Sequence, residues 1–465
     1  MNNIKSLDLS QYHTIFCDST ESIKWAYKNG LPKTATIKTS SPAVLWNKNP
    51  NIHNVEEMWN VNKSKRFQDA ITNLMKDIYS ASIDIPGVER ELALQVSQSA
   101  YKFQKIIYKA ACLCEADYTD TRLFIYVEGK TGPQGNIMNS PWDQLLSSNP
   151  LFLKINHTLT NDKWETLTTK GVSYYQRYKI AGYETMIYRI FVKLIKILPD
   201  SLFKKEVIMP NENELNIEIA SSLILRGVKV TKAQLDPSTV NKVALSNKYI
   251  KLLCEAILPI IREQIIRWVT PSAVEATLSL FKSHLKTQVE QFILLESKWK
   301  NIIVKNNKLK QAVLVNSPGN IKGRALSSVC SKRKIPLISS QHGVTVEISE
   351  SHKMLHFRLD NTMADLMFSY NHKIADIEKN TYFNKSKHYV VGMPSRLIRM
   401  KSAYKSNQTT PQIIYISTNL YRMGFSLSLK TDYMNALDEY KIITDILGKL
   451  PYKVCYKTYP EDNRR

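Results

Sequence analysis

The sequence is poor in several residue types, and each shortage excludes a class of protein. Only 14 of its 465 residues are glycine, which excludes collagen-like and glycine-rich low-complexity chains. No run approaches the roughly 18 to 20 apolar residues that a bilayer-crossing helix needs. Arginine-rich tracts are missing too, so we expect no dedicated nucleic-acid binding.

Cysteine is scarce as well, and its six positions do not have metal-ligand spacing. Cys112 and Cys114 form a C-x-C pair, but no second pair completes a zinc site. Most of the cysteines lie in apolar runs, as buried thiols do in a reducing compartment. Because the N-terminus also lacks a hydrophobic signal core, we expect a cytoplasmic protein without bound metal.

Acidic residues are outnumbered by basic ones. Lysine and arginine total 64 against 41 aspartates and glutamates, which gives a formal net charge of +23. Such a surplus favours polyanionic partners, among them phosphorylated ligands, acidic glycans and anionic membranes. We therefore expect any membrane contact to be limited to the surface of an anionic membrane. The length predicts two or three domains.

The N-terminal region has the strand–helix rhythm of a parallel sheet with crossover helices. One predicted strand, residues 12–17, ends before Asp18, and another, residues 122–127, ends before Glu128 and a glycine. Ligands bind at the carboxyl ends of parallel strands, so Asp18 and Glu128 are candidate catalytic carboxylates. The alternative for Asp18 is a helix N-cap.

The same rhythm returns from residue 311, and its most informative point is the sequence Gln341-His342-Gly343. This triplet follows the apolar strand-like run 335–338, with a glycine that permits close backbone approach. With an unperturbed pKa near 6.5, His342 can act as a general base or donate to a phosphate oxygen. The alternative is a structural histidine that caps the strand.

Two further predicted strands, 413–416 and 453–456, end in polar residues. Hydroxyl side chains at a strand-to-helix turn, with a nearby cation, are a common way to hold a phosphate. The alternative is an ordinary helix cap with a surface arginine. The candidate binding residues here are Ser417, Thr418, Asn419, Arg422, Lys457 and Glu461.

The order of these motifs carries a family resemblance. Gln341-His342-Gly343, then 390–394 (VVGMP), 415–419 (YISTN) and 457–461 (KTYPE), resembles bacterial surface-polysaccharide glycosyltransferases of the GT-B type. It is similar to capsule and lipopolysaccharide transferases that use CMP-Kdo or CMP-sialic-acid-like donors, and to CDP-glycerol glycerophosphotransferases of teichoic acid synthesis. The resemblance covers roughly residues 311–465. Tyr459 stands where those families have a histidine.

The resemblance implies an α/β fold with two Rossmann-like lobes facing each other. The N-terminal acceptor lobe would span residues 1–402, with a helical insertion at about 160–305. The nucleotide-sugar-binding lobe would begin within residues 411–465 and be incomplete in this chain.

The function that the resemblance implies is glycosyl transfer, in peripheral contact with the cytoplasmic face of the inner membrane. A sugar, such as a CMP-activated keto-sugar, would pass from its nucleotide to a surface polysaccharide or lipid-linked acceptor, without metal or cofactor. His342 would act as base or neutralise phosphate, and the donor would contact Gln341, Gly343, Ser417, Thr418, Asn419, Arg422, Lys457 and Glu461. The alternatives are a glycerophosphate or polyol-phosphate transferase and a non-catalytic remnant with the same fold.

Overall fold

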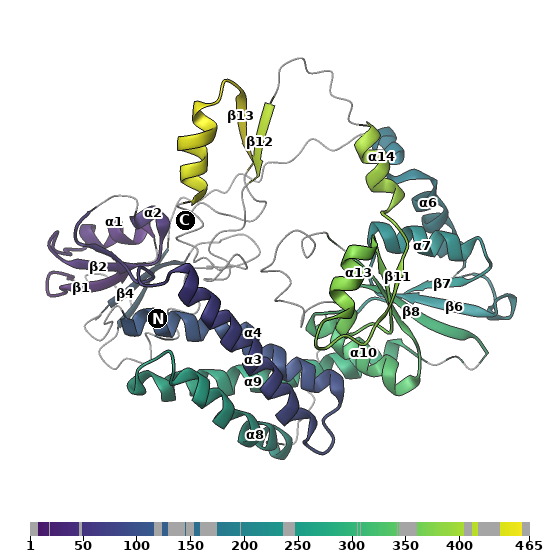
Figure 1. The fold of residues 1–465 in the computed structure, drawn as a ribbon, viewed down its shortest axis with the longest axis horizontal. Helices are drawn as coiled ribbons and strands as arrows, with labels where there is room; N and C mark the ends of the chain where they lie inside the picture. Colours follow the sequence, from purple (N-terminus) through teal and green to yellow (C-terminus); the bar gives the residue numbers. More distant parts are fainter. Residues whose placement is uncertain are drawn as a thin grey trace.

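The described residues of the computed structural model form three separate β-sheets, and every strand pair in them is parallel (Figure 1). This confirms the expected α/β class with crossover helices. The structure describes residues 8–17, 19–45, 49–115, 123–128, 145, 153–158, 174–195, 197–235, 247–304, 306, 308–341, 343, 360–403, 412–416 and 438–457.

The first sheet has the strand order β3-β2-β1-β4-β5. Its strands are β1 (Thr14–Cys17), β2 (Thr36–Thr39), β3 (Ile52–Asn54), β4 (Leu123–Glu128) and β5 (Leu153–Thr158). Between them lie α1 (Thr20–Lys28) and the short α2 (Pro42–Leu45). The Ser19 hydroxyl caps α1 by accepting from the Ser22 amide at 3.2 Å.

The second sheet has the strand order β11-β10-β9-β8-β6-β7. Its strands are β6 (Lys205–Met209), β7 (Lys229–Lys232), β8 (Lys310–Asn316), β9 (Leu337–Ser340), β10 (Leu366–Ser369) and β11 (Lys387–Val390). The helices beside it are α6 (Tyr174–Leu194), α7 (Glu214–Ile224), α10 (Ile321–Arg333), α13 (His372–Lys379) and α14 (Ser395–Ala403), with short 3-10 turns at Asp200–Leu202 and Asp360–Thr362.

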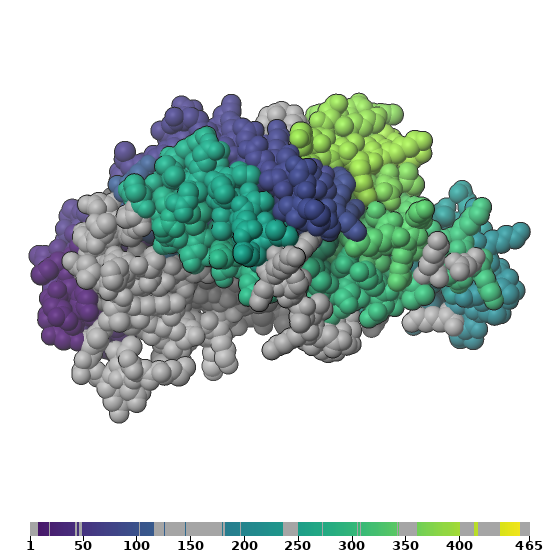
Figure 2. All heavy atoms as spheres, turned by 90° about the horizontal axis from the view of Figure 1, so that it is seen from below, coloured from purple at the N-terminus to yellow at the C-terminus, as the bar shows by residue number. Residues whose placement is uncertain are grey.

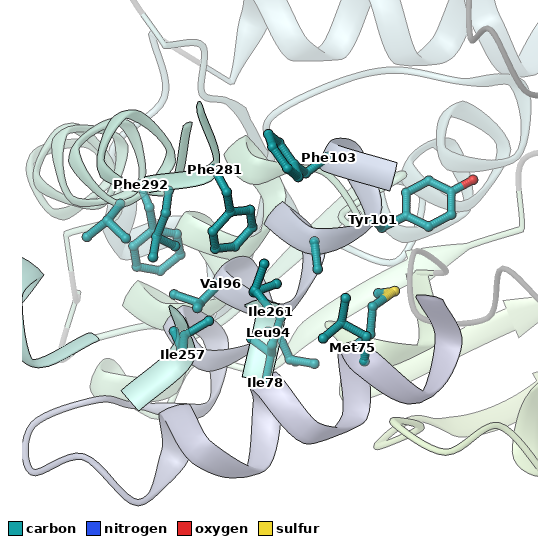
Figure 3. Packing of buried hydrophobic residues seen from close by; sticks show 14 of the residues in the cluster. Met75, Ile78, Leu94, Val96, Tyr101, Phe103, Ile257, Ile261, Phe281 and Phe292 are labelled. Atoms are coloured by element: carbon teal, nitrogen blue, oxygen red, sulfur yellow. The ribbon is translucent and has the colours of Figure 1, made fainter. Parts of the chain in front are cut away.

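Four long helices connect these two sheets: α3 (Val61–Ile83), α4 (Arg90–Glu115), α8 (Asn247–Ile265) and α9 (Pro271–Ile302). At 1.5 Å per residue, the 32 residues of α9 span about 48 Å. The helices meet through apolar side chains at intervals of three and four, among them Met75, Ile78, Ile257, Ile261 and Phe281 (Figure 3). In the space-filling view the bundle forms a continuous mass between the two sheets (Figure 2).

The alternation of side chains along the strands explains how each sheet is covered. In the first sheet, Phe16 belongs to the bundle core, whereas its neighbours Ile15 and Cys17 pack in a second cluster with α1. In the second sheet, Ile208 belongs to the bundle core, whereas Val207 packs with α6 and α7. Both sheets are therefore covered on two faces, and one core continues from Phe16 to the second sheet.

The C-terminal strands β12 (Gln412–Ile416) and β13 (Lys453–Lys457) pair in parallel and form a sheet of their own. A single π-helical turn (Ile442–Ile446) and a 3-10 turn (Leu447–Lys449) precede β13. Both strands agree with the predicted runs at 413–416 and 453–456 to within one residue.

The structure differs from the sequence prediction in the region 160–305. Strands β6 and β7 lie inside the expected helical insertion, so residues 1–402 contain two sheets. The reason is that β6 has a short apolar run (Val207–Met209) buried on both faces, which periodicity cannot distinguish from a helix segment. Across the described ranges, no helix has the length and apolar character to cross a bilayer.

Candidate functional site at the carboxyl edge of the second sheet

The strand order of the second sheet reverses beside β6. From β6 the chain moves outward to β7, and it then returns to the opposite side of β6 with β8, β9 and β10. In open parallel sheets ligands bind at the carboxyl ends of the strands where the order reverses. We call the carboxyl ends of β6, β8, β9 and β10, with the loops that follow them, the switch-point edge.

Asn211 joins the loop after β6 to the end of β8, on either side of the reversal. Its amide nitrogen donates to the Asn316 carbonyl at 2.7 Å, and its amide oxygen accepts from the Asn316 N–H at 2.7 Å. One side chain thus satisfies both backbone groups at the end of β8 and fixes the loop after β6 against it. The switch point is therefore preorganised.

A second polar group joins α7 to β9. The Ser340 hydroxyl donates to Asn216 Oδ1 at 2.6 Å and lies 3.3 Å from the amide nitrogen of Asn213, the N-cap of α7. Asn216 is fully buried, and its Nδ2 makes no hydrogen bond to the described residues. An unsatisfied buried amide costs about 1–3 kcal/mol and is typical of sites that await a ligand or water.

The loop between β8 and α10 contains a strained residue. Ser317 has φ 53°, a left-handed conformation that is uncommon for residues other than glycine and is concentrated at functional sites. Asn320 then caps α10 by accepting from the Gly323 N–H at 3.0 Å. A Cβ atom on Gly323 would lie 2.2 Å from the Pro318 carbonyl oxygen, so only glycine lets the loop pack this closely on the helix.

Arg324 of α10 stabilises the loop between β8 and α10. It is 1% exposed, and its guanidinium donates to the Gly319 carbonyl and, at 2.9 Å, to the Gln95 side chain on α4. The Gln95 amide in turn donates to Gln288 of α9 at 3.1 Å. The switch-point edge is therefore tied to the helical bundle by a buried polar chain.

Gln341 comes directly after β9, in the middle of the edge. It is buried, its amide nitrogen donates to the Gly343 carbonyl at 2.6 Å, and its amide oxygen accepts from the Tyr370 N–H at 2.8 Å. The Gln341 side chain thus holds the loops after β9 and β10, which makes it a positioning residue. Gly343 is exposed, and His342 between them lies outside the described residues.

Tyr370 comes directly after β10, and Glu214 is the first residue of α7. Burial raises the pKa of the Tyr370 phenol, and the Glu214 carboxylate raises it further. Glu214 pairs with Arg396 of α14 at 2.7 Å. The phenol is therefore protonated at neutral pH and can donate a hydrogen bond to an anionic ligand.

His388 of β11 lies next to Ser369 and Glu378, but the three do not form a catalytic relay. Ser369 Oγ and Glu378 Oε2 approach the same ring nitrogen, Nδ1, at 3.4 and 3.5 Å. Burial, followed by the charge of Lys379, lowers the pKa of His388 to about 4. The imidazole is therefore neutral at pH 7, and its contact with Glu378 is not an ion pair.

The other predicted site residues are distributed over the remaining sheets. Glu128 is the last residue of β4, at the carboxyl edge of the first sheet, opposite Thr158 in the register. Lys457 is the last residue of β13 and lies opposite Ile416. Those outside the described residues are Asp18, Ser417, Thr418, Asn419, Arg422 and Glu461.

Sequence reasoning missed the asparagines of the switch-point edge. Their signal is a repeated pattern in which an apolar strand is followed within four residues by an asparagine that caps a helix. Asn213, Asn320 and Asn371 cap α7, α10 and α13 in this way. Asn211 and Asn216 lack this pattern, because their partners are distant in the sequence.

Other polar clusters in the described part of the chain make weaker candidates. A hollow of about 670 Å³ lies beside Glu206, but that carboxylate already accepts from Thr231 and Gln311, each at 2.8 Å. Burial raises the pKa of the Cys330 thiol to about 12, so this cysteine is inert. The described residues hold no group of three or more histidine, cysteine or carboxylate side chains suited to a metal ion.

No family model, no curated protein and no solved structure matches this chain. The assignment of a function therefore depends on the geometry of the switch-point edge and on the motifs read from the sequence.

Proposed function

We propose that this protein is a glycosyltransferase that takes a sugar from a nucleotide donor and passes it to a bacterial surface polysaccharide or a lipid-linked acceptor. The observation that carries the proposal is the switch-point edge of the second sheet. Its two central loops are fixed by Asn211, and the N-terminus of α10 follows one of them. A helix N-terminus at a reversal of strand order favours a phosphorylated ligand.

Three features support a nucleotide donor at this edge. No acidic residue occurs in the first turn of α10, and the Asp360 carboxylate accepts from the Gly319 N–H before the helix at 3.3 Å. The phenol of Tyr370, which comes directly after β10, stays protonated and can donate a hydrogen bond. Gln341 holds the loop that continues into His342, the candidate for neutralising the leaving phosphate.

The choice of sugar transfer, with a CMP-linked keto-sugar as donor, comes from the motif order described above. The base on the acceptor hydroxyl would be Glu128, at the carboxyl end of β4, or the second candidate carboxylate, Asp18. Transfer would need no metal, because cationic and hydrogen-bonding groups would neutralise the leaving phosphate.

Thermal unfolding with CMP, CDP, UDP, GDP and inorganic phosphate tests this proposal. A nucleotide at about 100 times its Kd should stabilise the chain by about 2.7 kcal/mol. We expect stabilisation by cytidine nucleotides that is lost in His342→Ala and kept in the distant control Asn380→Ala. Stabilisation by inorganic phosphate alone, or by no nucleotide, would contradict a nucleotide site.

Radiolabelled donors distinguish sugar transfer from polyol-phosphate transfer. Label from a CMP-linked keto-sugar that enters a membrane-extracted glycan acceptor would support the proposed reaction. Label from CDP-glycerol would instead indicate the glycerophosphate transferase. The non-catalytic remnant would bind no nucleotide, so stabilisation by CMP in the thermal unfolding experiment would exclude it.

A further inference from the structure

We propose that the outer face of α6 docks the protein on an anionic membrane surface. The face consists of the exposed apolar residues that follow the bend at Gly182, and we call it the outer stripe. Its members are Tyr183, Met186, Ile190, Phe191 and Leu194 on the helix, with Ile197 and Leu198 after its end. Ile197, the most exposed, shows 82% of its surface to solvent. Isolated exposed apolar residues are normal, but a contiguous set marks an interaction site.

The outer stripe is distinct from the face that packs on the protein. With about 100° between successive residues, Tyr188, Val192 and Ile195 share one side of the helix and are buried in the second-sheet core. Ile190 and Leu194 project from the opposite half, next to Arg189 and Lys193. The helix therefore has a buried apolar side, an exposed apolar side and a basic flank between them.

The position of α6 leaves this stripe accessible. The helix lies at the outer end of the second sheet, far from the first sheet, in both views (Figures 1 and 2). Arg399 of α14 binds Glu184 through two contacts of 3.1 Å, which holds α14 on α6. Ile398, next to that arginine, is 62% exposed and extends the apolar surface.

The charges around the stripe determine which occupant fits. Glu184 is the only acidic residue within α6, and Arg399 neutralises it. Two carboxylates of α7 contact residues of α14: Glu214 pairs with Arg396 at 2.7 Å, and Glu218 accepts from Ser395 at 3.1 Å. Glu212, which lies within electrostatic reach of Arg189, pairs with Lys232. Glu184, Glu212 and Glu214 therefore each have a cationic partner. A basic, apolar helix surface on a chain of net charge +23 complements anionic lipid headgroups.

A second copy of this chain fits less well. In a two-fold dimer through the outer stripe, Arg189 and Lys193 of one copy would face the same residues of the other. Like charges held at close range oppose association, and the overall surplus of positive charge adds to this repulsion. Docking of the outer stripe on a membrane does not depend on which group the proposed transferase moves.

Vesicle co-sedimentation of the full chain tests the proposal. We expect binding to phosphatidylcholine vesicles with about a third phosphatidylglycerol, weak binding to phosphatidylcholine alone, and release as salt increases. Two double variants, Ile190→Ser with Phe191→Ser and Arg189→Gln with Lys193→Gln, should each weaken binding at least about tenfold.

Two matched controls should bind like the wild type. Met58→Ser with Ile266→Ser removes apolar residues elsewhere that are more exposed than Ile190 and Phe191, and Lys282→Gln with Lys373→Gln removes two exposed lysines elsewhere. Absence of binding to anionic vesicles, or equal weakening by the controls, would overturn the proposal. So would a two-chain mass by light scattering that the Ile190→Ser, Phe191→Ser variant reduces to one chain, because a second copy would then occupy the stripe.

Discussion

The two large sheets share one topological device but differ in how their carboxyl edges are held. Each sheet is parallel, and each reverses its strand order, between β1 and β4 in the first and between β6 and β8 in the second. At the second edge, Asn211 joins loops from two strands. At the first edge, Thr39 Oγ1 donates to the Cys17 carbonyl at 2.7 Å and accepts from the Ser41 N–H at 3.0 Å.

The difference is one of preorganisation. The bonds of the second edge run between loops, are made by long amide side chains and continue through Arg324 into the bundle. The bonds of the first edge run between adjacent strands, and the buried Ser40 and Ser41 hydroxyls make no hydrogen bond to the described residues. Both edges have buried polar groups left to satisfy, Asn216 at the second and these serines at the first. We infer that the second edge presents the more fixed surface to a ligand, because its loops are joined to each other and to the bundle.

The largest expected effect comes from cutting the link between the second edge and the bundle. Arg324→Ala removes a buried cation and leaves its partners Gln95 and Gly319 without a donor, so we expect a loss of about 3–5 kcal/mol in the free energy of unfolding. Urea unfolding measures this loss.

The matched control is Arg333→Ala on the same helix, where the side chain is partly exposed and should cost less than about 1 kcal/mol. Gln95→Ala cuts the same link from the other side if Arg324→Ala does not fold. A loss below about 1 kcal/mol for both variants would mean that the buried chain does not support the edge.

An intermediate effect is expected from opening the switch point itself. Asn211→Ala removes two hydrogen bonds of 2.7 Å to Asn316 and should cost about 1–2 kcal/mol. Because the two loops would then separate, stabilisation by nucleotide should decrease more than in Asn380→Ala, whose exposed amide donates to Asp376 at 2.8 Å. Unchanged nucleotide stabilisation, measured by thermal unfolding, would place the ligand elsewhere.

The elements of both sheets follow largely from local pattern. The apolar run 312–315 predicted β8, and the three- and four-residue spacing of apolar residues predicted the helices around Ile71 and Leu92. Strands β6 and β7 were missed because both are short and flanked by helices. For such buried runs, neighbours in space decide between helix and strand.

The candidate site was less predictable than the fold. Gln341 was found because it follows a strong apolar strand, but its role in holding Gly343 and Tyr370 needed the structure. Asn211 could not be paired with Asn316 from sequence, because 105 residues separate them. Hydrogen bonds between side chains of different loops produce no periodic pattern in the sequence. The sequence therefore locates the strand ends but not the contacts between them.

The smallest expected effect comes from a substitution at the first edge. Thr39→Val keeps the shape of the side chain and removes its bonds to Cys17 and Ser41, so we expect a loss of about 0.5–1.5 kcal/mol in urea unfolding. The control is Thr287→Val on α9, where an exposed hydroxyl donates to Ser283 at 3.0 Å and a smaller loss is expected.

The stabilisation of Thr39→Val by nucleotide distinguishes which edge binds the donor. If the second edge binds the donor, stabilisation by cytidine nucleotides should remain at the wild-type level in Thr39→Val while it falls in Asn211→Ala. A decrease in Thr39→Val as large as that in Asn211→Ala would mean that the two edges contribute equally. The less organised first edge would then be part of the nucleotide site, and its buried serines would be ligand-binding groups.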